Sequence, residues 1–241
     1  MDDAIYDDPR LVALYDLQNG PGPDSAFYLA LPAHPGMDIL DLGCGTGILT
    51  VDFAAAGHRV TGVDPAGPML QRARARPGGE GVTWIEGTAN AVHGAFDLAI
   101  MTGHAFQVLL TEAAALETLV ALRRSLRSGG RLAFESRNPA THAWTGWTPE
   151  RTRRHLSGDF GGVTVEQAVL GVDGPLVTFE TRHLFDDGAL LTSRSTLRFT
   201  PQDTLSDWLH TAGFGTVEWF GDWDRSPFLP GSREIIVLAH G

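Results

Sequence analysis

The stretch "ILDLGCGTGILT", residues 39–50, carries most of the information about the fold of this chain. A run of apolar residues leads into glycine at every second position, Gly43, Gly45 and Gly47, and Asp41 precedes these glycines. In open α/β sheets the turn from a buried strand into a helix is a common ligand site, because glycine lets the backbone approach a ligand closely and adopt positive φ. We therefore predict a ligand-binding loop here, with a plain tight turn as the weaker alternative.

The spacing of these glycines helps to distinguish between the classes of ligand that such a loop could bind. A dinucleotide-binding loop usually reads G-x-G-x-x-G, but Ile48 stands where that pattern requires its third glycine. Asp41 would repel a pyrophosphate and suits a ligand with an ammonium group. Asp64 lies about 20 residues further on, the distance at which a carboxylate accepts hydrogen bonds from ribose hydroxyls; its alternative role is to cap the next helix. The loop therefore predicts a nucleoside ligand with a cationic tail.

Apolar strands and helical segments alternate along the first part of the chain. Strands are expected at 37–43, 58–64, 82–88, 96–103 and 131–138, with helices between them and two more helices, at 4–18 and 25–32, before the first strand. This rhythm is typical of an α/β fold with a doubly wound parallel sheet. Three runs with period-2 alternation follow, at 162–172, 176–185 and 189–200, and predict a small antiparallel insert. A helix at 201–214 and strands at 216–223 and 232–240 complete a single domain, 1–241.

Composition excludes several classes of function. The chain has 29 acidic and 18 basic residues, which disfavours a nucleic-acid partner. No apolar run is long enough to cross a membrane, and the acidic start "MDDAIYDDPR" lacks the layout of a signal peptide. The basic residues are all arginine, which excludes lysine chemistry and a P-loop. The single cysteine, Cys44, allows no internal disulfide and favours a cytoplasmic location. No metal-ligand spacing occurs, so no metal is expected.

Four segments occur in a characteristic order: "DILDLGCGTG", "VTGVDPAGPMLQRAR", "FDLAIMTG" and "GGRLAFESRNP". In this order and spacing the chain resembles the class I S-adenosylmethionine-dependent methyltransferases, over most of its length. The resemblance implies a seven-stranded sheet of order 3-2-1-4-5-7-6, with residues 232–240 as the antiparallel strand seven. It also implies N-terminal helices (1–36) that form a lid, and a loop with the antiparallel insert between strands five and six (141–200) on the acceptor side.

The same resemblance implies S-adenosylmethionine as the cofactor. The backbone of Gly43, Cys44 and Gly45 would pack against its methionine part. Asp41 would interact with the methionine ammonium, directly or through water, and Asp64 would hold the ribose hydroxyls.

At the adenine end the resemblance implies contacts from the residues after strands two and three. Pro65 opens the helix after Asp64, and Met69 is either an adenine contact or a core residue. In "GTAN", 87–90, Thr88 stands where the family usually has an aspartate for the adenine amino group, and the backbone N–H of Ala89 is unaffected. Thr88 can accept one hydrogen bond in its place.

The residues near the reacting methyl group follow strand four. Thr102 and Gly103 should border the methionine end, and His104 is the side chain expected to face the acceptor. His104 is the candidate general base, or a histidine without a chemical role; Glu135 and His142 are the other candidates. Tyr15 is expected on the lid over the cofactor, with core packing as its alternative.

The acceptor side is expected to come from the end of strand five and the insert. Arg137 and Asn138 would orient the acceptor, and Arg137 could pair with a carboxylate. Trp144 and Trp147 would line an apolar acceptor pocket or stack on a cation; the alternative is that both pack the insert against the sheet.

These features predict methyl transfer to nitrogen or oxygen of a small-molecule acceptor by in-line displacement, in a monomer or homodimer with no nucleic-acid or membrane partner. The alternative is a protein that binds S-adenosylmethionine for another reaction, or as a binding module.

Overall fold

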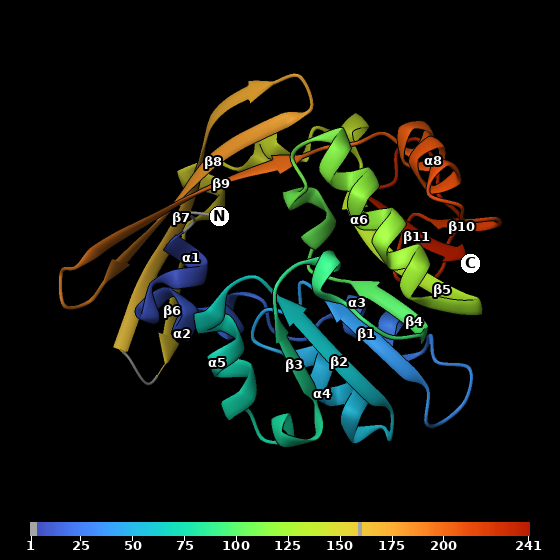
Figure 1. The fold of residues 1–241 in the computed structure, drawn as a ribbon. Helices are drawn as coiled ribbons and strands as arrows, with labels where there is room; N and C mark the ends of the chain where they lie inside the picture. The colour runs from blue at the N-terminus through green and yellow to red at the C-terminus, as the bar shows by residue number, and fades with distance from the viewer. Residues whose placement is uncertain (1–3, 159–160) are drawn as a thin grey trace.

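A seven-stranded sheet forms the centre of the computed structural model, which describes residues 4–158 and 161–241 (Figure 1). Its strands are β1 (Asp38–Leu42), β2 (Arg59–Asp64), β3 (Thr83–Glu86), β4 (Phe96–Met101), β5 (Leu126–Arg137), β10 (Val217–Phe220) and β11 (Glu234–His240). The spatial order is β10-β11-β5-β4-β1-β2-β3, and β11 runs antiparallel to both of its neighbours. With β10 and β11 as strands six and seven, the predicted order 3-2-1-4-5-7-6 is confirmed.

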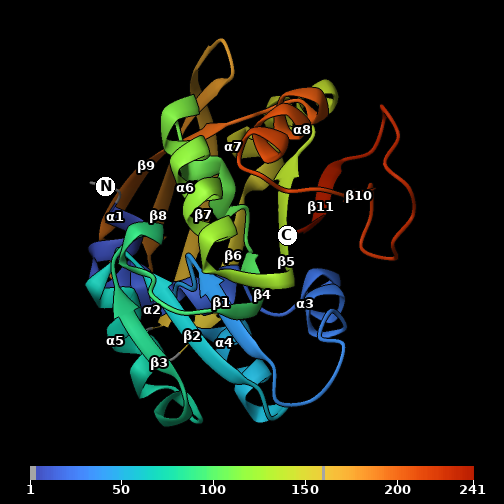
Figure 2. The same cartoon turned by 45° about the vertical axis from the view of Figure 1, so that its right-hand side comes forward.

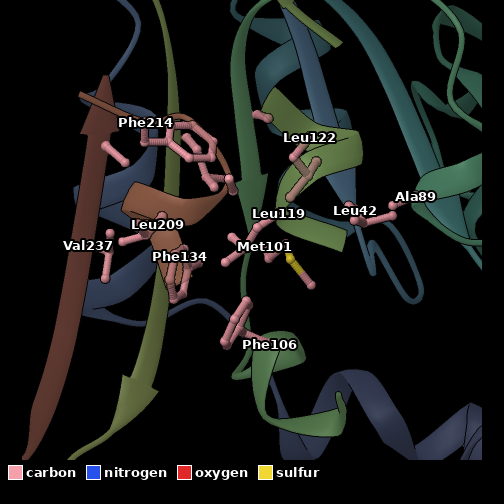
Figure 3. Close-up of a cluster of buried hydrophobic side chains, with 14 of the residues drawn as sticks. Leu42, Ala89, Met101, Phe106, Leu119, Leu122, Phe134, Leu209, Phe214 and Val237 are labelled. Carbon is pink, nitrogen blue, oxygen red and sulfur yellow. The ribbon is translucent and has the colours of Figure 1, made fainter. Parts of the chain in front are cut away.

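Helices cover both faces of this sheet because its strands are apolar on both faces. On one face, Ile39 and Leu98 pack with α3 (Pro23–Leu29) and α4 (Ile48–Ala55). On the other face, side chains of the sheet pack with α6 (Glu112–Ser125) and α8 (Gln202–Thr211). Figure 3 shows this second layer, in which Met101, Phe134 and Val237 meet Leu119 of α6 and Leu209 of α8. Each such buried side chain contributes about 1.5–3 kcal/mol to stability.

Shorter elements complete the description of the chain. Helix α5 (Gly67–Ala75) follows β2, and α7 (Pro149–Thr152) precedes the insert. Single 3-10 turns lie at η1 (Gly79–Gly81), η2 (Ala89–Ala91), η3 (Ala105–Val108), η4 (Pro139–Thr141) and η5 (Ala143–Gly146). The loop between β10 and β11 stands out on the side opposite the N-terminus (Figure 2), where Trp223 packs against Phe27 of α3. Within the described ranges, no helix is both long and apolar enough to cross a membrane.

The insert is a sheet with one strand more than the alternation pattern predicted. Its strands, in order, are β6 (Arg154–Gly158), β7 (Gly161–Asp173), β8 (Leu176–Phe185) and β9 (Leu190–Arg198), all antiparallel. The three predicted runs correspond to β7, β8 and β9. The additional strand β6 is a short edge strand that pairs only with β7 and is mostly exposed, so its sequence shows no period-2 pattern.

The N-terminal segment, expected as one helix over 4–18, forms α1 (Ala4–Asp7) and α2 (Pro9–Gln18). Pro9 has no N–H, and the carboxylate of Asp8 accepts hydrogen bonds from the N–H groups of Arg10 and Leu11, so a new helix begins there. Leu11 and Leu14 of α2 then pack into a third apolar cluster with the insert sheet. We call α1, α2 and the insert sheet together the roof. In Figure 1 the arrowheads of β1 and β2 point towards it.

Candidate functional site

A cavity of about 290 Å³ lies between the carboxyl edge of the central sheet and the roof. The sheet side contributes Gly43, Gly45, Asp64, Pro65, Ala66, Thr102, Gly103, His104, Ala105, Val108 and Arg137. The roof contributes Ile5, Tyr6, Asp7, Tyr15, Gln18, Asn19, Arg154, Gln167, Phe179, Thr181, Ser195 and Leu197. The cavity therefore joins the predicted glycine loop to side chains of the insert.

The glycine loop turns sharply at the end of β1. The N–H groups of Gly43 and Cys44 both donate to the carbonyl of Val63, at 2.7 and 3.1 Å. Gly43 has φ +80°, and a Cβ at this position would lie 2.9 Å from the Cβ of Ala105, in the segment after β4. The segments that follow β1 and β4 thus approach too closely for a side chain at Gly43.

Asp64, at the end of β2, shapes this loop and also faces the cavity. Its Oδ2 accepts a hydrogen bond from the N–H of Gly45 and its Oδ1 accepts one from the N–H of Ala66, both at 2.9 Å. Burial raises the pKa of Asp64, and these two hydrogen bonds act in the opposite direction. Each carboxylate oxygen retains a further lone pair, so Asp64 can cap the following turn and still accept hydrogen bonds from a diol in the cavity.

Asp41 lies beneath the loop and does not itself line the cavity. Its Oδ2 accepts a hydrogen bond from the hydroxyl of Thr50 (2.6 Å), while its Oδ1 is buried and has no hydrogen-bond partner among the described residues. Burial raises the pKa of Asp41 to about 7; the Thr50 hydrogen bond opposes this rise, and the charges of Asp64 and Glu135 add to it. An unpartnered buried carboxylate oxygen needs a donor, and an ammonium group or a bridging water would supply one.

Tyr15 of the roof closes the cavity over the glycine loop. A Cβ at Gly45 would lie 3.7 Å from its Cε1, and its ring centroid is 6.4 Å from that of Tyr6. Burial raises the pKa of Tyr15 to about 12, helped by the nearby charges of Asp64 and Asp16. Tyr15 therefore presents a neutral phenol to the cavity at physiological pH.

His104 lies at the cavity wall with an unusual backbone, φ +61°. Its N–H donates to Oε1 of Glu135 (2.6 Å), and its Nε2 lies 3.0 Å from Oε2 of Glu234. Tyr28 donates its hydroxyl proton to the other oxygen of Glu135. Burial raises the pKa of Glu135, and both of its oxygens are engaged, so it does not serve as a free base. His142 is exposed and does not line the cavity, which leaves His104 as the histidine placed there.

Three of the four residues expected to bind the acceptor lie elsewhere. The amide nitrogen of Asn138 donates to the carbonyls of Pro230 and Ser232, and its oxygen accepts from the N–H of Ala140. Its side chain therefore fixes a loop and does not line the cavity, and the expectation of acceptor binding is wrong.

Trp144 and Trp147 pack against aromatic side chains of the insert, which corresponds to the alternative role expected for them. Trp144 packs against Phe199 (4.6 Å between centroids), and Trp147 packs against Phe179 (4.9 Å). Both line a separate outer hollow, so they do not line the cavity as an apolar pocket. Phe179 is an aromatic side chain of the insert that does line the cavity, and Arg137 is the predicted acceptor residue that lines it.

Comparisons with known proteins agree with this geometry. Residues 39–130 match the family model described as "Methyltransferase domain". The chain is 28% identical over 145 residues to a cypemycin N-terminal methyltransferase from Streptomyces, a match that covers 58% of this chain and 59% of that protein. The chain thus matches less than two thirds of the length of this relative.

Solved structures share the fold over nearly the whole chain. The CcbJ methyltransferase from Streptomyces caelestis superposes with a TM-score of 0.77 at 23% identity, covering 95% of each chain. CalS10, an amino pentose methyltransferase from Micromonospora echinaspora determined with S-adenosylmethionine bound, superposes with a TM-score of 0.70 at 20% identity, covering 95% of this chain and 97% of that one. The chain therefore has a segment, 39–130, that matches a methyltransferase domain, and it shares the fold of these solved methyltransferases.

S-adenosylmethionine is the ligand bound in CalS10, and it is the cofactor that the sequence resemblance implies for this chain. The residues present fit it on two observations: the unpartnered Oδ1 of Asp41 suits an ammonium group, and Asp64 faces the cavity with lone pairs to spare for ribose hydroxyls. Gly43, Gly45, Thr102 and Gly103 line the same cavity. The side chain of Cys44 points away, because its Sγ would lie 3.1 Å from a Cβ placed at Gly62 of β2.

The residues expected at the adenine end differ in exposure and position. Pro65 is exposed and lines the cavity, whereas Met69 is fully buried and does not. Met69 therefore takes the core position that was its alternative. Thr88 is exposed and Ala89 is buried, and neither lines the cavity.

Sequence reasoning missed several residues of the cavity. Glu234 reaches His104 from β11, and Arg154, Gln167, Phe179, Thr181 and Ser195 reach the cavity from the insert. Phe179 and Thr181 are two apart on β8 and so share one face of the strand. That alternation was visible in the sequence, but nothing local indicated which face of the insert lies over the sheet.

Proposed function

We propose that this methyltransferase transfers a methyl group to a nitrogen or oxygen atom of a small-molecule acceptor bound beneath the roof. The observation that carries the proposal is the single cavity shared by Asp64 and the glycine loop, His104 and side chains of the insert. A cavity covered by α1, α2 and a four-stranded sheet suits a compact acceptor better than a polymer.

The cofactor, when bound, supplies an electrophilic methyl group on positively charged sulfur, which the acceptor atom attacks in line. The protein then needs to position the acceptor, exclude water and, where the nucleophile carries a proton, remove it. Tyr15 and the rest of the roof perform the exclusion of water in this proposal.

His104 is our candidate for the general base. Glu234 accepts the Nε2 proton at 3.0 Å, which leaves the lone pair of the neutral imidazole on Nδ1. The hydrogen bond from the His104 N–H to Glu135 holds its backbone in the left-handed region and fixes where the ring begins. In this arrangement Glu234 is a positioning residue for His104, and His104 takes the proton of the attacking atom.

Nitrogen is the acceptor atom we favour. Two similar proteins are described as an N-terminal methyltransferase and an amino pentose methyltransferase, names that point to amine acceptors in those proteins. The alternative, a module that binds the cofactor without methylating, would be favoured by a blocked acceptor side. The cavity instead continues past His104 to Arg137 and the insert.

Titration calorimetry with S-adenosylhomocysteine, with NAD as the control ligand, tests the first half of the proposal. We expect binding of S-adenosylhomocysteine alone. Methyl transfer from labelled S-adenosylmethionine to a panel of amines and alcohols tests the second half. Absence of S-adenosylhomocysteine binding would overturn the proposal, and cofactor binding without transfer to any class of acceptor would favour the binding-module alternative.

The proposal extends to location and partners. We propose a cytoplasmic protein that acts as a monomer or homodimer without a nucleic-acid or membrane partner. The single cysteine supports the cytoplasmic location, and the formal net charge of −11 disfavours a nucleic-acid partner.

A further inference from the structure

Arg137 places a half-buried cation on the acceptor side of the cavity. It is the last residue of β5, and its guanidinium lines the cavity beyond His104. Its Nη1 donates to Oε1 of Gln107 at 3.0 Å. Gln107 is itself buried and donates its amide to the carbonyl of Arg198 at 2.9 Å. The guanidinium is therefore held by a fixed partner and is not a mobile surface charge.

Arg137 forms no ion pair with any of the described residues, although two carboxylates lie near it. Glu135 is occupied by Tyr28 and by the N–H of His104, and Glu234 is directed to His104. Burial lowers the pKa of Arg137, and the more distant charges of Glu234 and Glu135 only partly offset this effect. An arginine remains protonated even so, and its described hydrogen bonds leave Nη2 and Nε without an acceptor.

Neighbouring side chains hold the guanidinium of Arg137 in a fixed orientation, in which it could bind a planar anionic group. Its Cζ lies 5.5 Å from the ring centroid of Trp147, which in turn packs on Phe179. Polar side chains of the insert, Gln167 and Thr181, share the same cavity wall, and Arg154 adds a second positive charge to it. Such a wall suits a small anion with an apolar part against Phe179.

We propose that the acceptor of this methyltransferase carries a carboxylate and that Arg137 binds that carboxylate through Nη2 and Nε. The inference rests on the proposed function, since it names the class of acceptor for the same site. A carboxylate matches the fork of a guanidinium in two parallel hydrogen bonds. A phosphate dianion fits less well, because Glu135 and Glu234 repel a second negative charge more strongly than a single one.

The test uses benzoate as an anionic probe and benzamide as its neutral counterpart, each titrated into the full-length protein saturated with S-adenosylhomocysteine. We expect wild type to bind benzoate roughly tenfold more tightly than benzamide, and Arg137→Gln to lose that preference while binding S-adenosylhomocysteine as wild type does. Arg124→Gln, at an exposed arginine of α6, is the matched control and should retain the preference. Arg137→Lys keeps the positive charge but loses the paired N–H donors of the guanidinium, and should retain only part of the preference for benzoate.

Three results would overturn the inference. The first is an equal affinity of wild type for benzoate and benzamide, and the second is a benzoate preference that survives in Arg137→Gln. The third is weakened S-adenosylhomocysteine binding in Arg137→Gln, which would assign Arg137 to the carboxylate of the cofactor. Should Arg137→Gln not fold by circular dichroism, Arg137→Lys replaces it, and a benzoate preference as large in Arg137→Lys as in wild type would overturn the inference. Failure of wild type to bind S-adenosylhomocysteine is a separate outcome, which refutes the proposed function itself.

Discussion

The carboxylate of Asp16 in α2 accepts a hydrogen bond from the hydroxyl of Thr46 in the glycine loop, at 2.5 Å. The same carboxylate pairs with Arg76 (2.6 Å) and Arg72 (3.3 Å), at the end of α5 and within it. Burial acts to raise the pKa of Asp16, but the hydrogen bonds from Thr46 and Arg76 outweigh it and hold that pKa below its usual value. One side chain thus links the roof to the glycine loop.

Replacing Asp16 by alanine should loosen that attachment. We expect Asp16→Ala to weaken S-adenosylhomocysteine binding roughly tenfold and to lower the free energy of unfolding by about 1–3 kcal/mol, because charge-assisted hydrogen bonds are lost. Calorimetry and urea unfolding measure the two effects. Asp52→Ala, at an exposed position of α4, is the control and should change neither. Wild-type affinity in Asp16→Ala would show that the roof is held in place without this contact.

Asp64 is expected to matter for the cofactor more than for the fold. Asp64→Ala removes the acceptor for the N–H groups of Gly45 and Ala66 together with the proposed ribose contacts. We expect affinity for S-adenosylhomocysteine to fall at least roughly tenfold, while circular dichroism shows an intact fold. Asp64→Asn keeps one acceptor oxygen, so its affinity for S-adenosylhomocysteine should lie between those of wild type and Asp64→Ala. Unchanged affinity in Asp64→Ala would refute the ribose assignment.

Cofactor binding should release a proton from Asp41. Its pKa of about 7 in the free protein means that it is about half protonated at pH 7, and a nearby ammonium group favours the carboxylate. Affinity for S-adenosylhomocysteine should therefore rise as pH increases towards 7 and level off above about pH 8. Calorimetry at pH 6.5 in phosphate and in an amine buffer, which differ in ionisation enthalpy, counts the protons released. Asp41→Asn should release fewer protons than wild type on binding S-adenosylhomocysteine. An equal release in both proteins would contradict the assignment of the released proton to Asp41.

The same shift has a consequence for the stability of the free protein. The pKa of Asp41 rises from 3.8 to about 7 on folding, so the folded state binds more protons between these values. The contribution of Asp41 is fully present below about pH 4 and is lost as pH rises through about 7. In urea unfolding, Asp41→Asn should therefore lower the free energy of unfolding less at pH 8 than at pH 5. A loss that is the same at both pH values would contradict the raised pKa of Asp41.

Gly47 and Gly57 both have positive φ, but only at Gly47 would an added Cβ meet close neighbours, so comparing their alanine variants distinguishes backbone strain from steric crowding. Gly47 (φ +76°) starts α4, and a Cβ there would lie 2.5 Å from Cη2 of Trp84 and 3.0 Å from the Cβ of Ala73. Gly57 (φ +89°) follows the same helix, and a Cβ there would meet nothing within 4 Å. We expect Gly57→Ala to cost about 1–2 kcal/mol from the backbone alone, and Gly47→Ala to cost about 1–3 kcal/mol more. Equal midpoints in urea unfolding would contradict this difference.

Much of the fold could be predicted because its signals are local. The apolar strands, the glycines after β1 and the aspartates at the ends of β1 and β2 depend on strand period and on backbone geometry within a few residues. The family resemblance of these ordered motifs then supplied the order of the strands. Short β6 was not predicted, because an exposed edge strand carries no alternation.

The acceptor side was decided by contacts between segments far apart in the sequence. Glu234 meets His104 because β11 enters the sheet antiparallel to β5, which places Glu234 opposite Arg137 in the register. Phe179 and Thr181 face the cavity because Leu11 and Leu14 of α2 pack into one apolar cluster with the insert. The sequence by itself therefore determined the glycine loop, since local backbone geometry specifies it. Tertiary packing alone decided which side chains line the cavity beside that loop, since burial of apolar surface between distant segments sets that arrangement.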